Sequence, residues 1–129
     1  MAKILIVDDE ETIRMLFNYV FADAGHEVFM AQNGREALDL VATLVPDAML
    51  LDVSMPVMTG PEFAHHLRKL AQQKPELANI PYWVMTGEDY MSGVTDFGFE
   101  KDAQFKGYLP KMTPPEEVMA LMAGALGGG

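Results

Sequence analysis

Three aspartates are spaced so that a nucleophile and a metal ion could share one site. Asp8 and Asp9 follow directly on the apolar run 4–7, and Asp52 follows directly on the apolar run 48–51. Continuous apolar runs of this kind predict buried strands of a parallel sheet, and such sheets bind ligands beyond the carboxyl ends of their strands. If these two strands are neighbours, the three carboxylates converge.

Carboxylates that lie this close repel one another unless a cation neutralises them. Oxygen donors without His or Cys favour Mg²⁺, or Mn²⁺, over zinc. A carboxylate can also attack phosphorus to form an aspartyl phosphate, and a cation beside it screens the anionic donor. Because Asp52 stands alone at its strand end, we predict that it is the nucleophile and that Asp8 and Asp9 hold the metal.

Two further strand ends offer groups that bind phosphoryl oxygens. Thr86 follows the predicted strand 80–85, and Lys111 follows the predicted strand 105–109. A hydroxyl and an ammonium at these positions would both donate hydrogen bonds to a phosphoryl group. We therefore predict that Thr86 and Lys111 complete the site.

The elements that position these residues alternate along the chain. Besides the four strands named above, residues 27–31 form a fifth predicted strand. Apolar residues at helical spacing predict helices around 13–21, 37–44, 63–70 and 118–126. Glycine and proline mark their ends: Gly25 caps the first, Pro46 stops the second, and Pro61 and Pro114 open the last two.

The segment 87–101 is predicted to be a short or irregular helix, because Gly93 and Gly98 lie within it. The whole pattern predicts an α/β fold with a parallel sheet covered on both faces. The chain has 129 residues, which suits one domain over residues 1–126, with a flexible C-terminal tail over 127–129.

The charge of the chain limits its partners. The net charge is −10, from 19 acids and 9 bases, so we expect no direct binding to nucleic acid or to an anionic membrane. The sequence has no cysteine, and we find neither a signal peptide nor an apolar run long enough to span a bilayer. These features predict a cytoplasmic protein.

Five segments, in order along the chain, resemble the response-regulator receiver domain of two-component signalling, in the form of a stand-alone chemotaxis-type receiver. They are ILIVDDE at 4–10, DAMLLDVSMP at 47–56, glycine at 60, VMTG at 84–87 and GYLPK at 107–111. The resemblance implies a doubly wound, flavodoxin-like sheet of strand order 2-1-3-4-5. It also implies transfer of a phosphoryl group to Asp52 from a sensor histidine kinase, a phosphotransfer protein or a small phosphodonor.

The resemblance further assigns roles around Asp52. Asp9, Asp52 and the backbone carbonyl of Ser54 would ligate Mg²⁺, with Asp8 assisting through water. Lys111 would pair with the phosphoryl group.

A switch of the docking surface is implied as well. Thr86 would move to hydrogen-bond the phosphoryl group, and Tyr108 would swing inward to present a surface to a downstream protein. From the residues alone, Tyr108 is equally well explained as a half-buried strand aromatic.

Two departures from the family pattern bear on these expectations. Met112 stands where the family usually has a proline after the lysine, in a cis peptide, and this affects how Lys111 is aimed. The interval from Thr86 to Lys111 is also longer than usual, which affects the segment 87–101.

Two other functions remain open. A degenerate receiver would dock partners without phosphorylation. An aspartate-nucleophile phosphatase would also use Mg²⁺, but Ser54 stands where its general acid belongs. We expect no enzyme activity beyond self-catalysed phosphotransfer and autodephosphorylation.

Overall fold

A computed structural model of the chain describes residues 2–52, 58, 60–86, 104–111 and 113–125. The strands are β1 (Lys3–Val7), β2 (Glu27–Ala31), β3 (Ala48–Asp52), β4 (Tyr82–Thr86) and β5 (Phe105–Pro110). The helices are α1 (Glu11–Asp23), α2 (Gly34–Val41), α3 (Gly60–Ala71), the 3₁₀ turn η1 (Pro75–Asn79) and α4 (Pro115–Ala125). All strand pairs are parallel, in the order β2-β1-β3-β4-β5, which confirms the predicted sheet.

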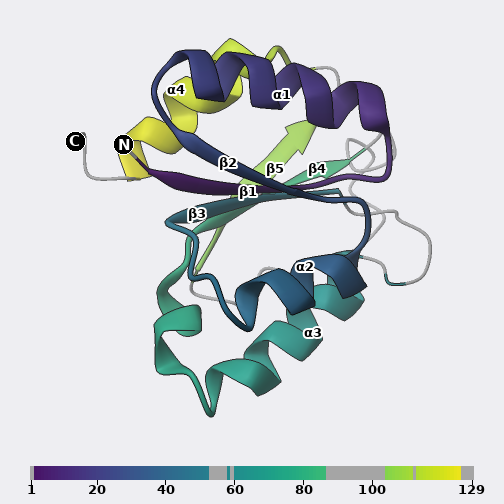
Figure 1. Ribbon diagram of the computed structural model, residues 1–129, viewed down its shortest axis with the longest axis vertical. Helices are drawn as coiled ribbons and strands as arrows, with labels where there is room; N and C mark the ends of the chain where they lie inside the picture. Colours follow the sequence, from purple (N-terminus) through teal and green to yellow (C-terminus); the bar gives the residue numbers. More distant parts are fainter. Residues whose placement is uncertain (1, 53–57, 59, 87–103, 112, 126–129) are drawn as a thin grey trace.

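The sheet forms the middle of three layers, with α1 and α4 on one face and α2 and α3 on the other (Figure 1). Successive side chains of a strand point to opposite faces, so apolar strands build a core on each side. The α1–α4 core contains Ile4, Ile6, Phe17, Phe21, Ala48, Leu50, Trp83, Met85, Leu109, Val118 and Met122. The α2–α3 core contains, among others, Leu5, Val7, Val41, Met49, Leu51, Phe63, Leu67, Tyr82 and Val84.

Local sequence explains how two of the connections are made. Gly25, just after α1, has φ 95°, a conformation that glycine adopts without strain. Asn33 caps α2, because its side-chain oxygen accepts the Glu36 N–H at 2.9 Å. A Cβ on Gly34 would lie 2.9 Å from Cγ of Met58, so glycine lets Met58 pack against the start of α2.

The predicted end of the second helix was wrong. α2 ends at Val41, whereas the apolar stripe was expected to continue to Leu44 before Pro46. The N–H groups of both Thr43 and Leu44 donate to the Leu40 carbonyl, at 3.1 and 2.8 Å, so the chain tightens into a turn.

The predicted start of the fourth strand was also wrong. β4 begins at Tyr82 because Ile80 instead ends η1, a 3₁₀ turn that the apolar pattern did not indicate. At the other end of β4 and of β3 the strands run one residue further than predicted, so Thr86 and Asp52 are terminal strand residues.

Several predictions lie outside the described residues. They concern the irregular helix over 87–101, the Ser54 carbonyl, the bond between Lys111 and Met112, and the tail over 127–129. Within the described residues no helix has the length and apolarity needed to cross a bilayer.

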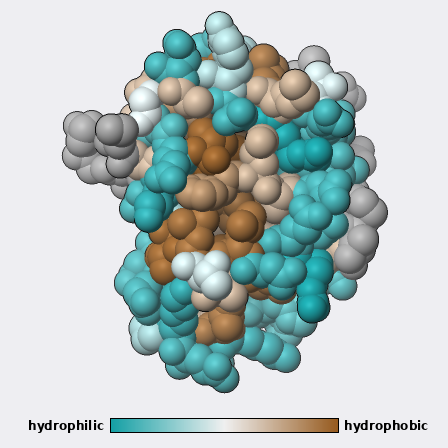
Figure 2. Space-filling view, viewed as in Figure 1, coloured by the Kyte–Doolittle hydropathy of each residue, from teal (hydrophilic) through white to brown (hydrophobic). Residues whose placement is uncertain are grey.

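One edge of the sheet, β2, is partly open to solvent. Met30 on this strand is 40% exposed. Figure 2 shows hydrophobic surface across the middle of the molecule, at the level of the sheet in Figure 1.

Candidate functional site

Polar side chains gather where neighbouring parallel strands end. Asp8 follows β1 directly, while Asp52 and Thr86 are the last residues of β3 and β4. In the described part of the chain these three are the buried polar or charged residues, each with at most 3% of its surface exposed. Burial of a carboxylate is costly unless partners or a cation compensate, so these positions are candidates for chemistry.

The strand ladder explains why the lysine reaches the aspartates. The Asp8 N–H donates to the Ala31 carbonyl at 3.1 Å, and the Lys111 N–H donates to the Thr86 carbonyl at 2.9 Å. Each bond extends a parallel ladder by one residue beyond the strand. Because successive side chains of a strand point to opposite faces, Asp8, Asp52 and Lys111 lie on the same side of the sheet, which is the side of α1 and α4.

The ammonium of Lys111 lies among three carboxylates. Its Nζ is 2.9 Å from Oδ2 of Asp52, 4.0 Å from Oδ1 of Asp8 and 2.6 Å from Oε1 of Glu10. Partial burial lowers the pKa of Lys111, but the hydrogen bonds to Glu10 and then Asp52 outweigh it and hold the pKa above its usual value. Lys111 therefore stays charged at any physiological pH.

The site disfavours ionisation of Asp8. Its pKa is raised to about 6, chiefly by burial and also by the charge of Asp52, while the Glu10 N–H and Lys111 oppose the rise. The Glu10 N–H donates to Oδ1 of Asp8 at 2.9 Å, and Arg14 Nη1 donates to its backbone carbonyl at 2.8 Å. These contacts fix the orientation of Asp8 towards the lysine.

The carboxylates at the start of α1 suit a hard cation. Asp8, Asp9 and Glu10 each offer an oxygen, and these oxygens lie within 4.8 Å of one another. Asp9 and Glu10 are exposed, so the group is open to solvent. The donors are all oxygens, which fits Mg²⁺ or Mn²⁺. Asp52 adjoins this group through Lys111 and is not part of it.

The two predicted switch residues lie on the other face of the sheet. Tyr108 is opposite Val84 in the β4–β5 register, and Thr86 is two residues further along β4 on the same face. Tyr108 is half-buried, and its ring packs at a 4.9 Å centroid distance against Phe105.

Two site residues were missed from sequence, Glu10 and Arg14. Glu10 could have been identified from the sequence, because it follows an acid pair at the start of a helix and glutamate is a poor N-cap residue. Arg14 had none, since its contact is with a backbone carbonyl.

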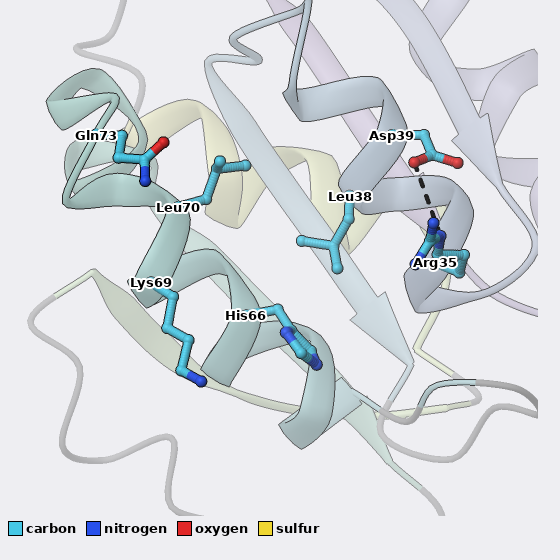
Figure 3. Close-up of a pocket in the computed structure, with 7 residues that line it drawn as sticks. All are labelled: Arg35, Leu38, Asp39, His66, Lys69, Leu70 and Gln73. Atoms are coloured by element: carbon cyan, nitrogen blue, oxygen red, sulfur yellow. Dashed lines mark ion pairs between the residues drawn. The ribbon is translucent and has the colours of Figure 1, made fainter.

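A hollow of about 390 Å³ lies between α2 and α3, away from the carboxylates (Figure 3). Its lining residues are Arg35, Leu38, Asp39, His66, Lys69, Leu70 and Gln73. It contains none of the predicted site residues.

The chain was compared with known proteins. The family model of the response regulator receiver domain matches residues 4–123. Response regulator MprA of Mycolicibacterium vanbaalenii is 37% identical over 124 residues, which are 96% of this chain and 50% of that protein. The chain thus spans about half the length of the MprA proteins it matches.

Solved structures agree with the fold. A putative response regulator from Chloroflexus aurantiacus superposes with a TM-score of 0.81 at 31% identity, covering 98% of each chain. The chemotaxis response regulator CheY4 of Vibrio cholerae gives a TM-score of 0.72 at 35% identity, covering 95% of this chain and 96% of that one.

Proposed function

Because this chain belongs to the response regulator receiver domain family, we propose that its Asp52 accepts a phosphoryl group and thereby switches a protein-docking surface. The observation that carries the proposal is the 2.9 Å contact between Lys111 Nζ and the buried Asp52 carboxylate, beside Asp8. A buried carboxylate next to a fixed ammonium suits attack on phosphorus and neutralisation of the group transferred.

The donor is a phosphohistidine of a sensor kinase or phosphotransfer protein, or a small phosphodonor. A carboxylate oxygen of Asp52 attacks phosphorus, the bond from phosphorus to the donor imidazole breaks, and the leaving nitrogen takes up a proton. Lys111 then binds a phosphoryl oxygen. In autodephosphorylation water attacks phosphorus, the bond to Asp52 breaks, and inorganic phosphate leaves.

A divalent cation, Mg²⁺ or Mn²⁺, would be held by Asp8, Asp9, Asp52 and the backbone carbonyl of Ser54. The carboxylate oxygens of Asp8 and Asp9, which lie within 4.8 Å of one another in the acidic group, support their part in this assignment. When bound, the cation would neutralise charge on the carboxylates and on the incoming phosphoryl group.

The response would be transmitted through β4 and β5 to a downstream protein. Thr86 would turn its hydroxyl towards the phosphoryl group, and Tyr108 would move inward into the space released. Their placement on one face, two residues apart along the β4–β5 ladder, supports this coupling.

The test is labelling with acetyl phosphate and Mg²⁺, followed by intact mass. We expect wild type to gain one phosphoryl group, and Asp52→Asn to gain none. Asp47→Asn is the matched control, because it makes the same change at the residue just before β3 and should be labelled like wild type.

Other outcomes separate the alternatives. An inert wild type would overturn the proposal and favour a phosphorylation-independent docking module. Labelling of Asp52→Asn would move the acceptor elsewhere. Steady hydrolysis of unrelated phosphoesters would support a phosphatase.

A further inference from the structure

Glu10 occupies the N-cap position of α1 without capping the helix. Its backbone is extended, with φ −90° and ψ 115°, and its carbonyl accepts the first helical hydrogen bond from the Arg14 N–H at 3.1 Å. Its side chain makes no hydrogen bond to the helix backbone, unlike that of a good N-cap. The side chain reaches across the site to Lys111 instead.

Two carboxylates share the one ammonium. Lys111 Nζ lies 2.6 Å from Glu10 and 2.9 Å from Asp52. The Glu10 side chain is 54% exposed, that of Lys111 is 26% exposed, and that of Asp52 is 2% exposed. Glu10 therefore binds the ammonium from the solvent side and Asp52 binds it from the interior.

We propose that Glu10 is a positioning residue, which holds the Lys111 ammonium at the mouth of the site and releases it when Asp52 is phosphorylated. This proposal rests on the function proposed above. Transfer places new anionic oxygens on Asp52, and Lys111 turns from Glu10 to bind them. A contact that exists before transfer and is lost during it raises the barrier, because only interactions that strengthen in the transition state accelerate a reaction.

The first experiment measures the rate of labelling by acetyl phosphate at fixed Mg²⁺. Glu10→Gln leaves only a neutral acceptor, and Glu10→Asp keeps the charge but is one methylene too short to reach Lys111. We expect both to be labelled roughly two- to fivefold faster than wild type, the range of a partly exposed ion pair. Glu11→Gln, which removes an exposed neighbouring charge, should leave the rate unchanged.

The aspartate variant separates contact from simple repulsion. If Glu10 acted only by repelling the anionic donor, Glu10→Asp would behave like wild type while Glu10→Gln became faster. That result would overturn the proposal. So would an equal increase in labelling rate in Glu11→Gln, or unchanged or slower labelling in the Glu10 variants.

The second experiment needs no phosphorylation. In protein labelled with ¹⁵N-lysine, the side-chain NH₃⁺ signal of Lys111 is assigned by its loss in Lys111→Arg. We expect this signal to shift in both Glu10 variants and to stay in place in Glu11→Gln. An unmoved signal overturns the positioning role even where Asp52 is labelled, whereas absence of labelling in wild type overturns the proposed function whatever the signal shows.

Discussion

Among the described residues, bases lie against acids in two places, and the two places differ in burial. In the hollow between α2 and α3, Arg35 Nε lies 3.8 Å from Asp39, and both side chains are about 70% exposed, at 69% and 72% (Figure 3). At the strand ends, Lys111 lies 2.9 Å from Asp52, with 26% and 2% exposed. The same types of charged group therefore meet in water in one region and largely out of water in the other.

This difference in burial determines which charged groups affect stability and pKa values. Water solvates and screens the exposed pair, so its net contribution to stability is small. Around Lys111 the carboxylates of Asp8 and Asp52 are desolvated, and the raised pKa of Asp8 reflects that cost. A cluster in which burial raises the pKa of a carboxyl group is typical of a functional site, whereas the hollow has the properties of ordinary solvated surface.

The largest difference between the regions should appear on adding Mg²⁺. At a hundredfold excess of Mg²⁺ over its Kd, we expect wild type to gain about 2.7 kcal/mol in the free energy of unfolding. Asp9→Ala should lose this gain, and labelling with it, while its unfolding without Mg²⁺ stays cooperative. Urea unfolding with and without Mg²⁺ measures the effect. Asp39→Asn is the control. If it also lost the stabilisation by Mg²⁺, the two regions would not differ in cation binding.

Removing a base should cost much more in the cluster than in the hollow. Lys111→Ala takes away the ammonium that Asp52 binds, and we expect a loss of about 2 kcal/mol without divalent ions, less than for a fully buried pair because Lys111 is partly exposed. Some labelling should persist, with a smaller conformational response. Lys69→Ala, which removes a lysine that lines the hollow, serves as the comparison in the same urea titration. Equal losses would mean that burial is not the deciding factor.

Asp8 makes the free energy of unfolding depend on pH. Its pKa is about 6 in the folded state against 3.8 ordinarily, so between these two pH values the folded protein holds a proton that the unfolded chain has released. The stability from this proton is complete below the unfolded pKa and is lost as the pH rises through the folded pKa. Without divalent ions, Asp8→Asn should therefore be more stable than wild type by about 1 kcal/mol near neutral pH.

That gain should vanish at about pH 4, where Asp8 of the folded wild type is already neutral. Urea unfolding of both proteins across this range measures it. A constant difference at every pH would show that packing rather than charge is responsible.

The central strands β1, β3 and β4 could be predicted because each is a run of apolar residues, and burial on both faces requires that pattern. The strand order was expected from the resemblance to receiver domains. The sequence also indicated that Asp8, Asp52 and Lys111 lie close together, since the carboxyl ends of parallel strands meet at one edge. Thr86 lies at the same edge, but on the opposite face of the sheet. These inferences use periodicity and position along the chain, which a sequence contains directly.

The remaining features depend on tertiary contacts. α2 stops at Val41 because the following turn closes on the Leu40 carbonyl, although Leu44 continues the apolar stripe. The contact of Glu10 with Lys111 joins an N-cap position to a residue beyond β5, and no periodicity encodes which of several nearby acids an ammonium will choose. Sequence patterns thus indicate which side chains lie near one another, while tertiary packing determines which of them form contacts.

The smallest effect should be found in the hollow itself. Arg35→Gln removes the charge that faces Asp39, and we expect the free energy of unfolding to change by no more than about 0.5 kcal/mol, because both side chains are mostly in water at 3.8 Å. Any change should shrink further as salt is raised, since screening acts on exposed charges. Urea titrations at low and high salt measure it, with Arg35→Lys as the charge-conserving control. A loss near that of Lys111→Ala would show that exposed charges matter as much as buried ones here, and the contrast between the two regions would then have to be abandoned.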